Sequence, residues 1–210
     1  MPDHAELYEA ILAGDAQKAR EVTVAALEAD ADPSELLQKH MIPAMGEVGR
    51  RFECNEYFVP ELLIAARAMK TALELITPHL AAAGAEPAGR VVIGTVQGDL
   101  HDIGKNLVAS MLEGGGFQVV DLGVDVAPDQ FVKAVQDNKC NILALSALLT
   151  TTMTMMKAVI DALQAAGVRD QTKVMIGGAP ITQQYADEIG ADGYSDNASA
   201  AVALARKLVD

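Results

Sequence analysis

The sequence has few of the residues on which several common classes of protein depend. It contains no Trp, only four Phe and four Tyr, and just two Cys, Cys54 and Cys140, in 210 residues. Two cysteines so far apart provide neither a disulfide framework nor the paired spacing of a zinc site. We therefore expect a reduced protein with free thiols, whose core consists mainly of Ala, Leu, Val, Ile and Met.

Basic residues and long apolar runs are also scarce. There are 16 Lys and Arg against 29 Asp and Glu, for a formal net charge of −13, which argues against nucleic acid or an anionic membrane surface as a partner. No stretch approaches the roughly 18 apolar residues of a membrane span, and the N-terminal MPDHAELYEA lacks the apolar segment of a secretory signal. The sequence thus predicts a cytoplasmic protein without a nucleic-acid or membrane partner.

Residues 1–83 carry only helical signals. Apolar residues recur at helical spacing in segments separated by Gly, Pro and Asp, and Pro43 is expected to kink or break the third segment. Four short helices with short connections predict a small helix bundle. The stretch 84–89 is unpatterned and bears Gly and Pro, so we predict that it links the bundle to a second domain at 90–210.

From residue 90 on, strand and helix patterns alternate. The predicted strands are Val91–Val96, Phe117–Asp121, Ile142–Ser146, Lys173–Ile176 and a short one near Asp192–Tyr194. The predicted helices are Ile103–Glu113, Pro128–Asn138, Met153–Ala166, Thr182–Ile189 and Ala198–Leu208. Such units predict an α/β domain with a Rossmann-like (flavodoxin-like) five-stranded parallel sheet covered on both faces. In a 2-1-3-4-5 order, ligands bind at the carboxyl ends of the strands, between the first and third.

Three loops that should meet at this edge carry residues that could bind a ligand or take part in a reaction. They hold a histidine with a nearby carboxylate, a pair of hydroxyls and a pair of glycines: Asp99 and His101, Ser146 and Thr150, Gly177 and Gly178. A neutral histidine is a common metal ligand, and a carboxylate that binds its other N–H fixes the tautomer. No second His, Cys or carboxylate cluster recurs in the other loops. A single protein ligand suits a metal that arrives inside a macrocycle.

Each of these residues also has an ordinary structural interpretation. His101 could cap a helix from its loop, and Asp99 could be the N-cap of the helix that follows. Ser146 and Thr150 could bond to local backbone, and the two glycines could form a plain turn. The functional interpretation depends on the presence of all three loops in one sequence.

Taken together, the loops resemble a known family. Asp99-x-His101-x-x-Gly104, the two hydroxyls and the glycine pair are similar to the three signatures of the cobalamin-binding Rossmann-like domain. The segment Met45–Lys70 resembles the helical cap that precedes this domain in methionine synthase and in the corrinoid proteins of methylamine, methanol and related methyltransferase systems. The resemblance covers nearly the whole chain.

This resemblance implies a role for each matching residue. The cofactor would be cobalamin or a related corrinoid, in its methylcobalamin and Co(I) forms. His101 would be the lower axial ligand of cobalt, with Asp99 and Ser146 as its hydrogen-bonded relay. Phe52 and Val59 would cover the upper face, although Phe52 could instead belong to the bundle core. The other residues expected to contact the cofactor are Gly98, Asp102, Ile103, Gly104, Leu148, Thr150, Gly177, Gly178 and Ala179.

The function that the resemblance implies is that of a methyl carrier. A substrate-specific methyltransferase would supply the methyl group from a methylamine, betaine, methanol or methoxy-aromatic donor, and an acceptor methyltransferase would pass it to a thiol or tetrahydrofolate. A reductive activation protein is a further candidate partner, and the chain is not expected to catalyse turnover alone. The alternatives are a cobalamin-dependent sensor, the small subunit of an adenosylcobalamin mutase and a cofactor-free domain of the same shape.

Overall fold

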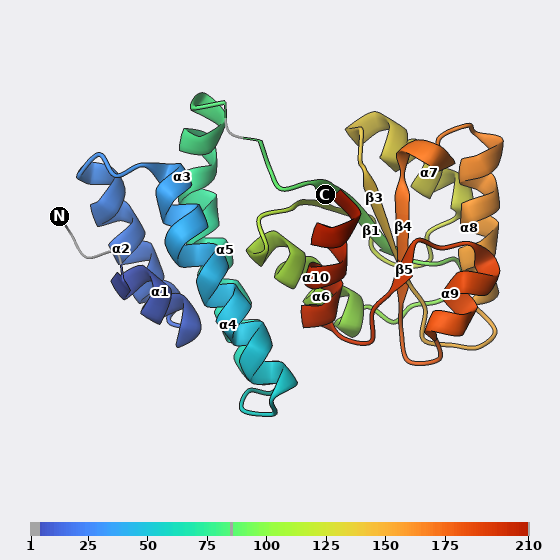
Figure 1. Cartoon of the computed structure of the whole chain (residues 1–210), viewed down its shortest axis with the longest axis horizontal. Coiled ribbons are helices and arrows are strands. Elements are labelled where there is room, and N and C mark those ends of the chain that lie inside the picture. Colours follow the sequence, from blue (N-terminus) through green and yellow to red (C-terminus); the bar gives the residue numbers. More distant parts are fainter. Residues whose placement is uncertain (1–4, 85, 210) are drawn as a thin grey trace. The chain divides into compact units, whose positions relative to one another are not determined.

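The computed structural model describes residues 5–84 and 86–209. The chain divides into two compact units, drawn in Figure 1: one runs to Pro87 and includes Glu113–Gly116, and the other comprises Ala88–Leu112 and the chain from Phe117 on. The division between residues 87 and 88 falls within the linker predicted at 84–89. Each unit is described by itself.

The first unit is helical. Its elements are α1 (Ala5–Leu12), α2 (Ala16–Glu28), α3 (Pro33–Glu35), the π-helical η1 (Leu36–Met41), α4 (Ile42–Glu53) and α5 (Val59–Ala82). Side chains cap the N-termini of α2 and α3. Asp15 accepts a hydrogen bond from the Lys18 N–H at 2.9 Å, and Asp32 accepts one from the Ser34 N–H at 2.8 Å. Such caps satisfy N–H groups that have no partner within the helix.

The chain remains helical through Pro43 instead of ending there. Pro43 has no N–H to donate, so a regular α-helical ladder cannot pass through it unchanged. The six residues of η1, just before it, adopt the wider π-helical hydrogen bonding, and the Ile42 N–H bonds to the Leu37 carbonyl. The predicted interruption is thus a change of helix type, and α3, η1 and α4 follow one another without a loop.

The two longest helices of this unit bury many small side chains. Helix α2 packs along α5. Both helices bury alanines, which allow their backbones to approach closely: Ala19, Ala26, Ala65, Ala66, Ala68 and Ala72. Larger buried side chains, among them Leu7, Leu36 and Met69, complete the bundle core. None of this unit's four aromatic residues, Tyr8, Phe52, Tyr57 and Phe58, is fully buried, so aliphatic side chains make up its core.

The second unit contains a parallel sheet in the predicted strand order. The strands are β1 (Arg90–Thr95), β2 (Gln118–Asp121), β3 (Ile142–Ser146), β4 (Lys173–Gly177) and β5 (Gly193–Tyr194). They lie side by side in the order β2-β1-β3-β4-β5, and every pairing is parallel. The fold class expected from the sequence is therefore confirmed, and the switch in strand order lies between β1 and β3.

Helices cover both faces of this sheet. They are α6 (Ile103–Gly114), α7 (Pro128–Asn138), α8 (Thr154–Ala165), α9 (Gln183–Ile189) and α10 (Ala198–Val209), with a short 3-10 turn, η2 (Arg169–Gln171). Figure 1 shows α6 and α10 on one face and α7, α8 and α9 on the other. Alternate residues of β1 follow this division, since Val91 and Ile93 pack with the first pair of helices and Val92 with the second group.

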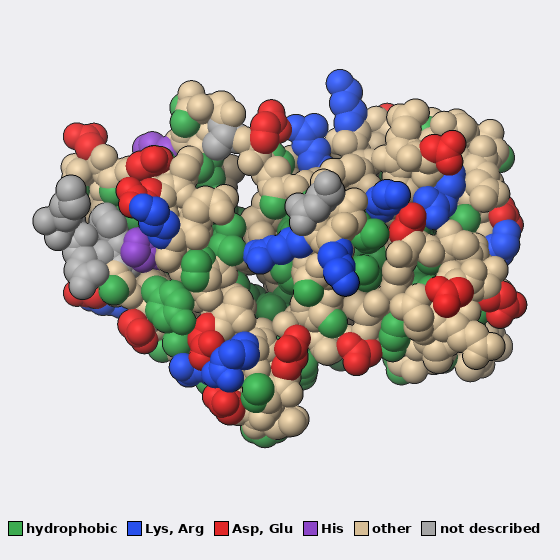
Figure 2. Space-filling model, viewed as in Figure 1, with side chains coloured by type: hydrophobic (Ala, Val, Ile, Leu, Met, Phe, Trp, Pro, Cys, Tyr) green, Lys and Arg blue, Asp and Glu red, His purple; other side chains and the backbone are tan. Residues whose placement is uncertain are grey.

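The surface carries charges of both signs. On the face drawn in Figure 2, Lys and Arg side chains stand close to Asp and Glu side chains in each unit. Ion pairs of this kind join Lys18 to Glu6 at 2.8 Å and Arg51 to Glu47 at 2.8 Å. Within the described residues, 5–84 and 86–209, no helix is both long enough and apolar enough to cross a membrane.

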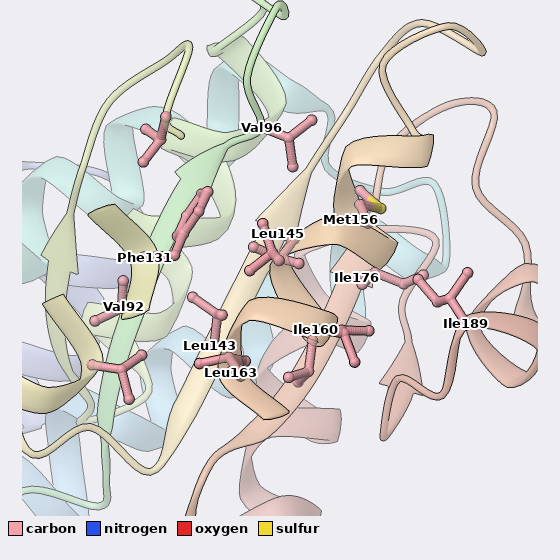
Figure 3. Packing of buried hydrophobic residues seen from close by; sticks show 14 of the residues in the cluster. Val92, Val96, Phe131, Leu143, Leu145, Met156, Ile160, Leu163, Ile176 and Ile189 are labelled. Carbon is pink, nitrogen blue, oxygen red and sulfur yellow. The ribbon is translucent and has the colours of Figure 1, made fainter. Parts of the chain in front are cut away.

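The core between the sheet and helices α7, α8 and α9 includes the ring of Phe131 of α7. Its ring is fully buried among aliphatic residues of the sheet and α8, several of which are labelled in Figure 3. Gly94 of β1 makes room for it, because a Cβ atom at that position would lie 2.7 Å from Phe131 Cε1. The ring therefore packs directly on the strand that leads to the His101 loop.

Removing this ring tests the description of the core. We expect Phe131→Ala to lower the free energy of unfolding of the second unit by about 3–5 kcal/mol, since it leaves a cavity in a close-packed core. Urea unfolding followed by circular dichroism measures the change. Lys133→Ala is the matched control, because it changes an exposed position of the same helix, and its effect should stay within about 0.5 kcal/mol. Equal losses in the two variants would contradict the assigned core.

Candidate functional site

Three strand ends lie in register at the carboxyl edge of the sheet. Thr95 of β1 is paired with Ser146 of β3, which is in turn paired with Gly177 of β4. The loops that follow these strands touch one another: the Leu148 N–H donates to Asp99 at 2.8 Å, and Gly178 lies against Ala147. The predicted meeting of three loops at this edge is thus present in the fold.

The Asp99 carboxylate is the centre of the hydrogen bonding. It is completely buried. One oxygen, Oδ2, accepts from Thr152 Oγ1 at 2.6 Å and from the N–H groups of Leu148 at 2.8 Å and Leu149 at 3.3 Å. The other oxygen accepts from the His101 N–H at 3.1 Å and faces His101 Nδ1 at 2.7 Å. Asp99 thus fastens the His101 loop to the loop after β3.

These hydrogen bonds set the charge of Asp99. Burial by itself raises the pKa of the carboxyl, but the bonds from Thr152, Leu148 and His101 outweigh it and hold the pKa of Asp99 well below its ordinary value. Asp99 is therefore a carboxylate at neutral pH. The proton between it and His101 belongs on Nδ1, and the hydrogen bonding assigns the tautomer in which Nε2 carries a lone pair.

The imidazole of His101 is accessible and has apolar neighbours. Its side chain is 51% exposed, although the carboxylate behind it is buried. Four large apolar side chains of the same two loops are also exposed: Leu100, Ile103, Leu148 and Leu149. Apolar side chains gathered around a polar group and open to water are typical of a ligand-binding surface. The surface fits a flat, partly apolar ligand with a metal at its centre.

The hydroxyl that bonds to Asp99 is that of Thr152, and this corrects the predicted relay. We expected Ser146, but no hydrogen bond joins Ser146 to Asp99 within residues 5–84 and 86–209. Ser146 ends β3 and is half-buried. Thr152 lies beyond the strand, in the turn before α8, where the chain folds back over the Asp99 loop. A hydroxyl in the predicted second loop is thus present, six residues later than predicted.

A second residue that the sequence did not reveal is Asp125, in the loop after β2. Its N–H donates to the Asp99 carbonyl at 3.0 Å, and its carboxylate accepts from the Gly98 N–H at 2.7 Å. Gly98 and Asp125 both have positive φ angles, +83° and +54°. Asp tolerates this conformation better than most residues. No sequence motif marks Asp125, because its role follows from the contact between two loops.

Most other predicted residues lie on the loops where they were expected. Asp102 begins the turn into α6 and accepts from Asn106 Nδ2 at 3.1 Å. Gly104 has open space beside it, since a Cβ there would meet no atom within 4 Å. Thr150 and Ala179 are exposed in their loops. Contact of these residues with a cofactor stays a prediction.

The glycine pair allows a close approach of two loops. Gly178 has a φ of +135°, and a Cβ atom there would lie only 1.9 Å from the Ala147 carbonyl oxygen. At Gly177 a Cβ would lie 3.2 Å from the Ser195 carbonyl oxygen. Any side chain at Gly178 would therefore force the loop after β4 away from the loop after β3.

Phe52 and Val59 belong to the helical unit. Phe52 is half-buried near the end of α4, and Val59 is the first residue of α5 with 41% of its surface exposed. The intervening turn is held by Tyr57, whose hydroxyl receives a hydrogen bond from Arg51 at 3.0 Å and donates to the Leu12 carbonyl at 3.2 Å. The position of Phe52 and Val59 over the cofactor stays a prediction.

The donor set fits a metal that brings most of its own ligands. In the part of the chain that the structure describes, no group of three His, Cys, Asp or Glu side chains could hold a metal ion. What the site offers is one exposed imidazole whose other nitrogen is fixed by a buried carboxylate. This arrangement suits a corrinoid, in which the macrocycle supplies the other nitrogen ligands to cobalt.

Comparison with known families agrees with this geometry. Residues 89–203 match a family described as B12 binding domain, and residues 4–77 match a second family of the same description. A curated relative is trimethylamine corrinoid protein 2 of Methanosarcina mazei, which is 49% identical over 191 residues, or 90% of this chain and 88% of that protein.

Solved structures of similar proteins extend along the whole chain. A cobalamin-binding protein from Desulfitobacterium hafniense has a TM-score of 0.82 and 35% identity, with all of both chains covered. The methanol:cobalamin methyltransferase complex from Methanosarcina barkeri contains a chain with a TM-score of 0.87 and 32% identity, covering 100% of this chain and 81% of that one. The chain therefore belongs to the corrinoid proteins, a family built on B12 binding domains, and its cofactor is a corrinoid.

Proposed function

We propose that this protein carries a methyl group on a corrinoid between two methyltransferases. The observation that carries the proposal is the exposed imidazole of His101, whose Nδ1 lies 2.7 Å from the buried Asp99 carboxylate. This pairing leaves Nε2 free to bind a metal. Relatives named trimethylamine and dimethylamine corrinoid proteins support the same role, as does the structure of a methanol:cobalamin methyltransferase complex.

The residues around His101 would hold the cofactor. His101 Nε2 would bind the metal, and the exposed Leu100, Ile103 and Leu148 would lie against the macrocycle. The loops that end in Ser146, Thr150 and Gly177–Gly178 would take the part of the cofactor that extends into the edge of the sheet. When bound, the corrinoid supplies a cobalt centre that accepts and releases a methyl group.

The chain's own part is to control one proton and to exclude water. Asp99 remains anionic and holds the proton of Nδ1, so the imidazole keeps the tautomer that can bind a metal. An imidazole whose Nε2 carries the proton cannot bind a metal, so this hydrogen bond decides whether His101 can be a ligand. Phe52 and Val59 of the helical unit would shield the reactive face from water and move aside for each partner.

The proposed partners follow from the names of the chain's relatives. We propose a substrate-specific methyltransferase for a methylated amine as the first partner, since trimethylamine and dimethylamine corrinoid proteins are among the relatives at 40% identity or more. The second would be a methyltransferase that delivers the methyl group to a thiol or tetrahydrofolate. A reductive activation protein would restore the cofactor after accidental oxidation.

Transfer between purified components tests the proposed function. The corrinoid-loaded, reduced protein is mixed with trimethylamine, with and without a trimethylamine methyltransferase, and methylation is followed by the visible spectrum and by the dimethylamine formed. We expect methylation only in the presence of the methyltransferase, with methanol and its methyltransferase as the comparison. Failure with every methyltransferase, together with stable corrinoid binding, would contradict the carrier function and favour the sensor.

Removal of the imidazole tests the ligand assignment. We expect His101→Ala to fold normally, because the side chain is half exposed, but to lose the visible spectrum of imidazole-ligated corrinoid. The measurement is an ultraviolet–visible spectrum after reconstitution with hydroxocobalamin and methylation. His79→Ala, which removes an exposed histidine of α5, is the matched control and should leave the spectrum unchanged. An unaltered spectrum in His101→Ala would remove His101 as the ligand.

Asp99→Asn tests how the ligand is controlled. Without the carboxylate, nothing keeps the proton on Nδ1, and the tautomer whose Nε2 carries the proton cannot bind a metal. The share of corrinoid that is bound to the imidazole should therefore fall. The visible spectrum of the loaded protein at one fixed pH measures this share. Asp129→Asn is the control, because its exposed carboxylate lies in the first turn of α7, outside the loops expected to hold the cofactor. An imidazole-bound share that is the same in Asp99→Asn and the unmodified protein would exclude the proton-control role.

A further inference from the structure

The main chain of His101 is fixed on both sides. The residue lies between β1 and α6, in a segment that is neither helix nor strand. Its N–H donates to Asp99 Oδ1 at 3.1 Å, and its carbonyl oxygen accepts a hydrogen bond from Thr95 Oγ1 at 2.9 Å. Asp99 is two residues away along the same loop. Thr95 belongs to the sheet, so it is the anchor that ties His101 to a rigid element.

Thr95 is well placed to be such an anchor. It is the last residue of β1, it is completely buried, and it pairs with Ser146 of β3. Its own N–H bonds to the Gly123 carbonyl at 2.9 Å, and its carbonyl accepts from the Val126 N–H at 3.0 Å. Its backbone is therefore held between two neighbours, and its hydroxyl has little freedom to follow the loop.

A buried hydroxyl at this position calls for a physical reason. Valine has nearly the same shape, favours strands at least as well and brings no polar group into the core. The hydroxyl costs free energy of desolvation, which a hydrogen bond to the His101 carbonyl offsets. Because that bond is made to the main chain of His101, a threonine instead of a valine at position 95 has a direct consequence for the site.

Thr172 provides a comparison within the same unit. Its side chain is also buried, at 1% exposure, and lies just before β4. Within the described part of the chain, its Oγ1 has no hydrogen-bond partner. A change from Thr to Val at position 172 therefore removes a buried hydroxyl of the same kind without touching the His101 loop.

We propose that Thr95 is a positioning residue for the axial ligand. Its hydroxyl fixes the His101 carbonyl, and with it the direction of the Cα–Cβ bond, while Asp99 fixes the rotation of the ring. Both constraints are needed to keep Nε2 in one place, since a residue held only by its near neighbour in the loop can swing with that loop. The proposal rests on the proposed function of His101 as the ligand.

The first experiment compares three variants loaded with methylcobalamin. Thr95→Val keeps the volume and removes the hydroxyl, Thr95→Ser restores it, and Thr172→Val is the control. The visible spectrum gives the ratio of imidazole-bound to imidazole-free corrinoid. We expect this ratio to fall about three- to tenfold in Thr95→Val, as the loss of one hydrogen bond implies, and to stay near the unmodified value in the other two variants.

A second experiment uses the unmodified protein without cofactor, so it does not depend on the folding of any variant. Nuclear magnetic resonance with carbon-13 and nitrogen-15 labels reports on the Thr95 hydroxyl proton and the His101 carbonyl carbon. We expect a slowly exchanging hydroxyl proton coupled to that carbonyl. A hydroxyl that exchanges freely with water would overturn the proposal.

The outcomes separate this inference from the proposed function. If the unmodified protein binds corrinoid without any imidazole ligation, the ligand assignment of His101 fails. If ligation is present and Thr95→Val retains the unmodified ratio, only the role of Thr95 fails. Equal falls in Thr95→Val and Thr172→Val would mean that a general loosening of the core is responsible, and this result would also overturn the positioning role.

Discussion

The structure of this site depends on one buried carboxylate. Asp99 accepts hydrogen bonds from Thr152 and from the backbone of Leu148 in the loop after β3, and it faces Nδ1 of His101 in its own loop. The same contacts therefore join two loops, keep the carboxylate ionised and select the tautomer of the imidazole. A neutral or unsatisfied Asp99 would leave His101 without orientation and the loops without a common anchor.

The parallel sheet makes this arrangement possible. Because Thr95, Ser146 and Gly177 lie in register, the loops that follow their strands begin side by side. The glycine at position 178 lets the third loop approach the second more closely than any side chain would allow. The strands bring the loops together, while the chemistry depends on a few side chains at their ends, which agrees with the rule for ligand sites in open α/β sheets.

Much of the fold could be predicted because buried parallel strands have a plain signature. The strand Ile142–Ser146 and the helix Pro128–Asn138 occur with the predicted bounds, since apolar runs and a proline start define them locally. The relay hydroxyl could not be chosen, because Thr150, Thr151 and Thr152 follow one another and only the path of the turn decides which one reaches Asp99. Thr95 and Asp125 act through contacts between loops, which leave no pattern along the sequence.

The central claim is that a protein imidazole binds the metal, and isotope labelling tests it most directly. The protein is prepared with nitrogen-15 histidine, loaded with unlabelled cobalamin and reduced to the Co(II) form, and its electron paramagnetic resonance spectrum is recorded. Ligation by His101 predicts doublet splitting of the cobalt lines from nitrogen-15, and the triplet of ordinary nitrogen should return in unlabelled protein. A triplet in the labelled protein would show that the cofactor keeps its own dimethylbenzimidazole, and would contradict the account.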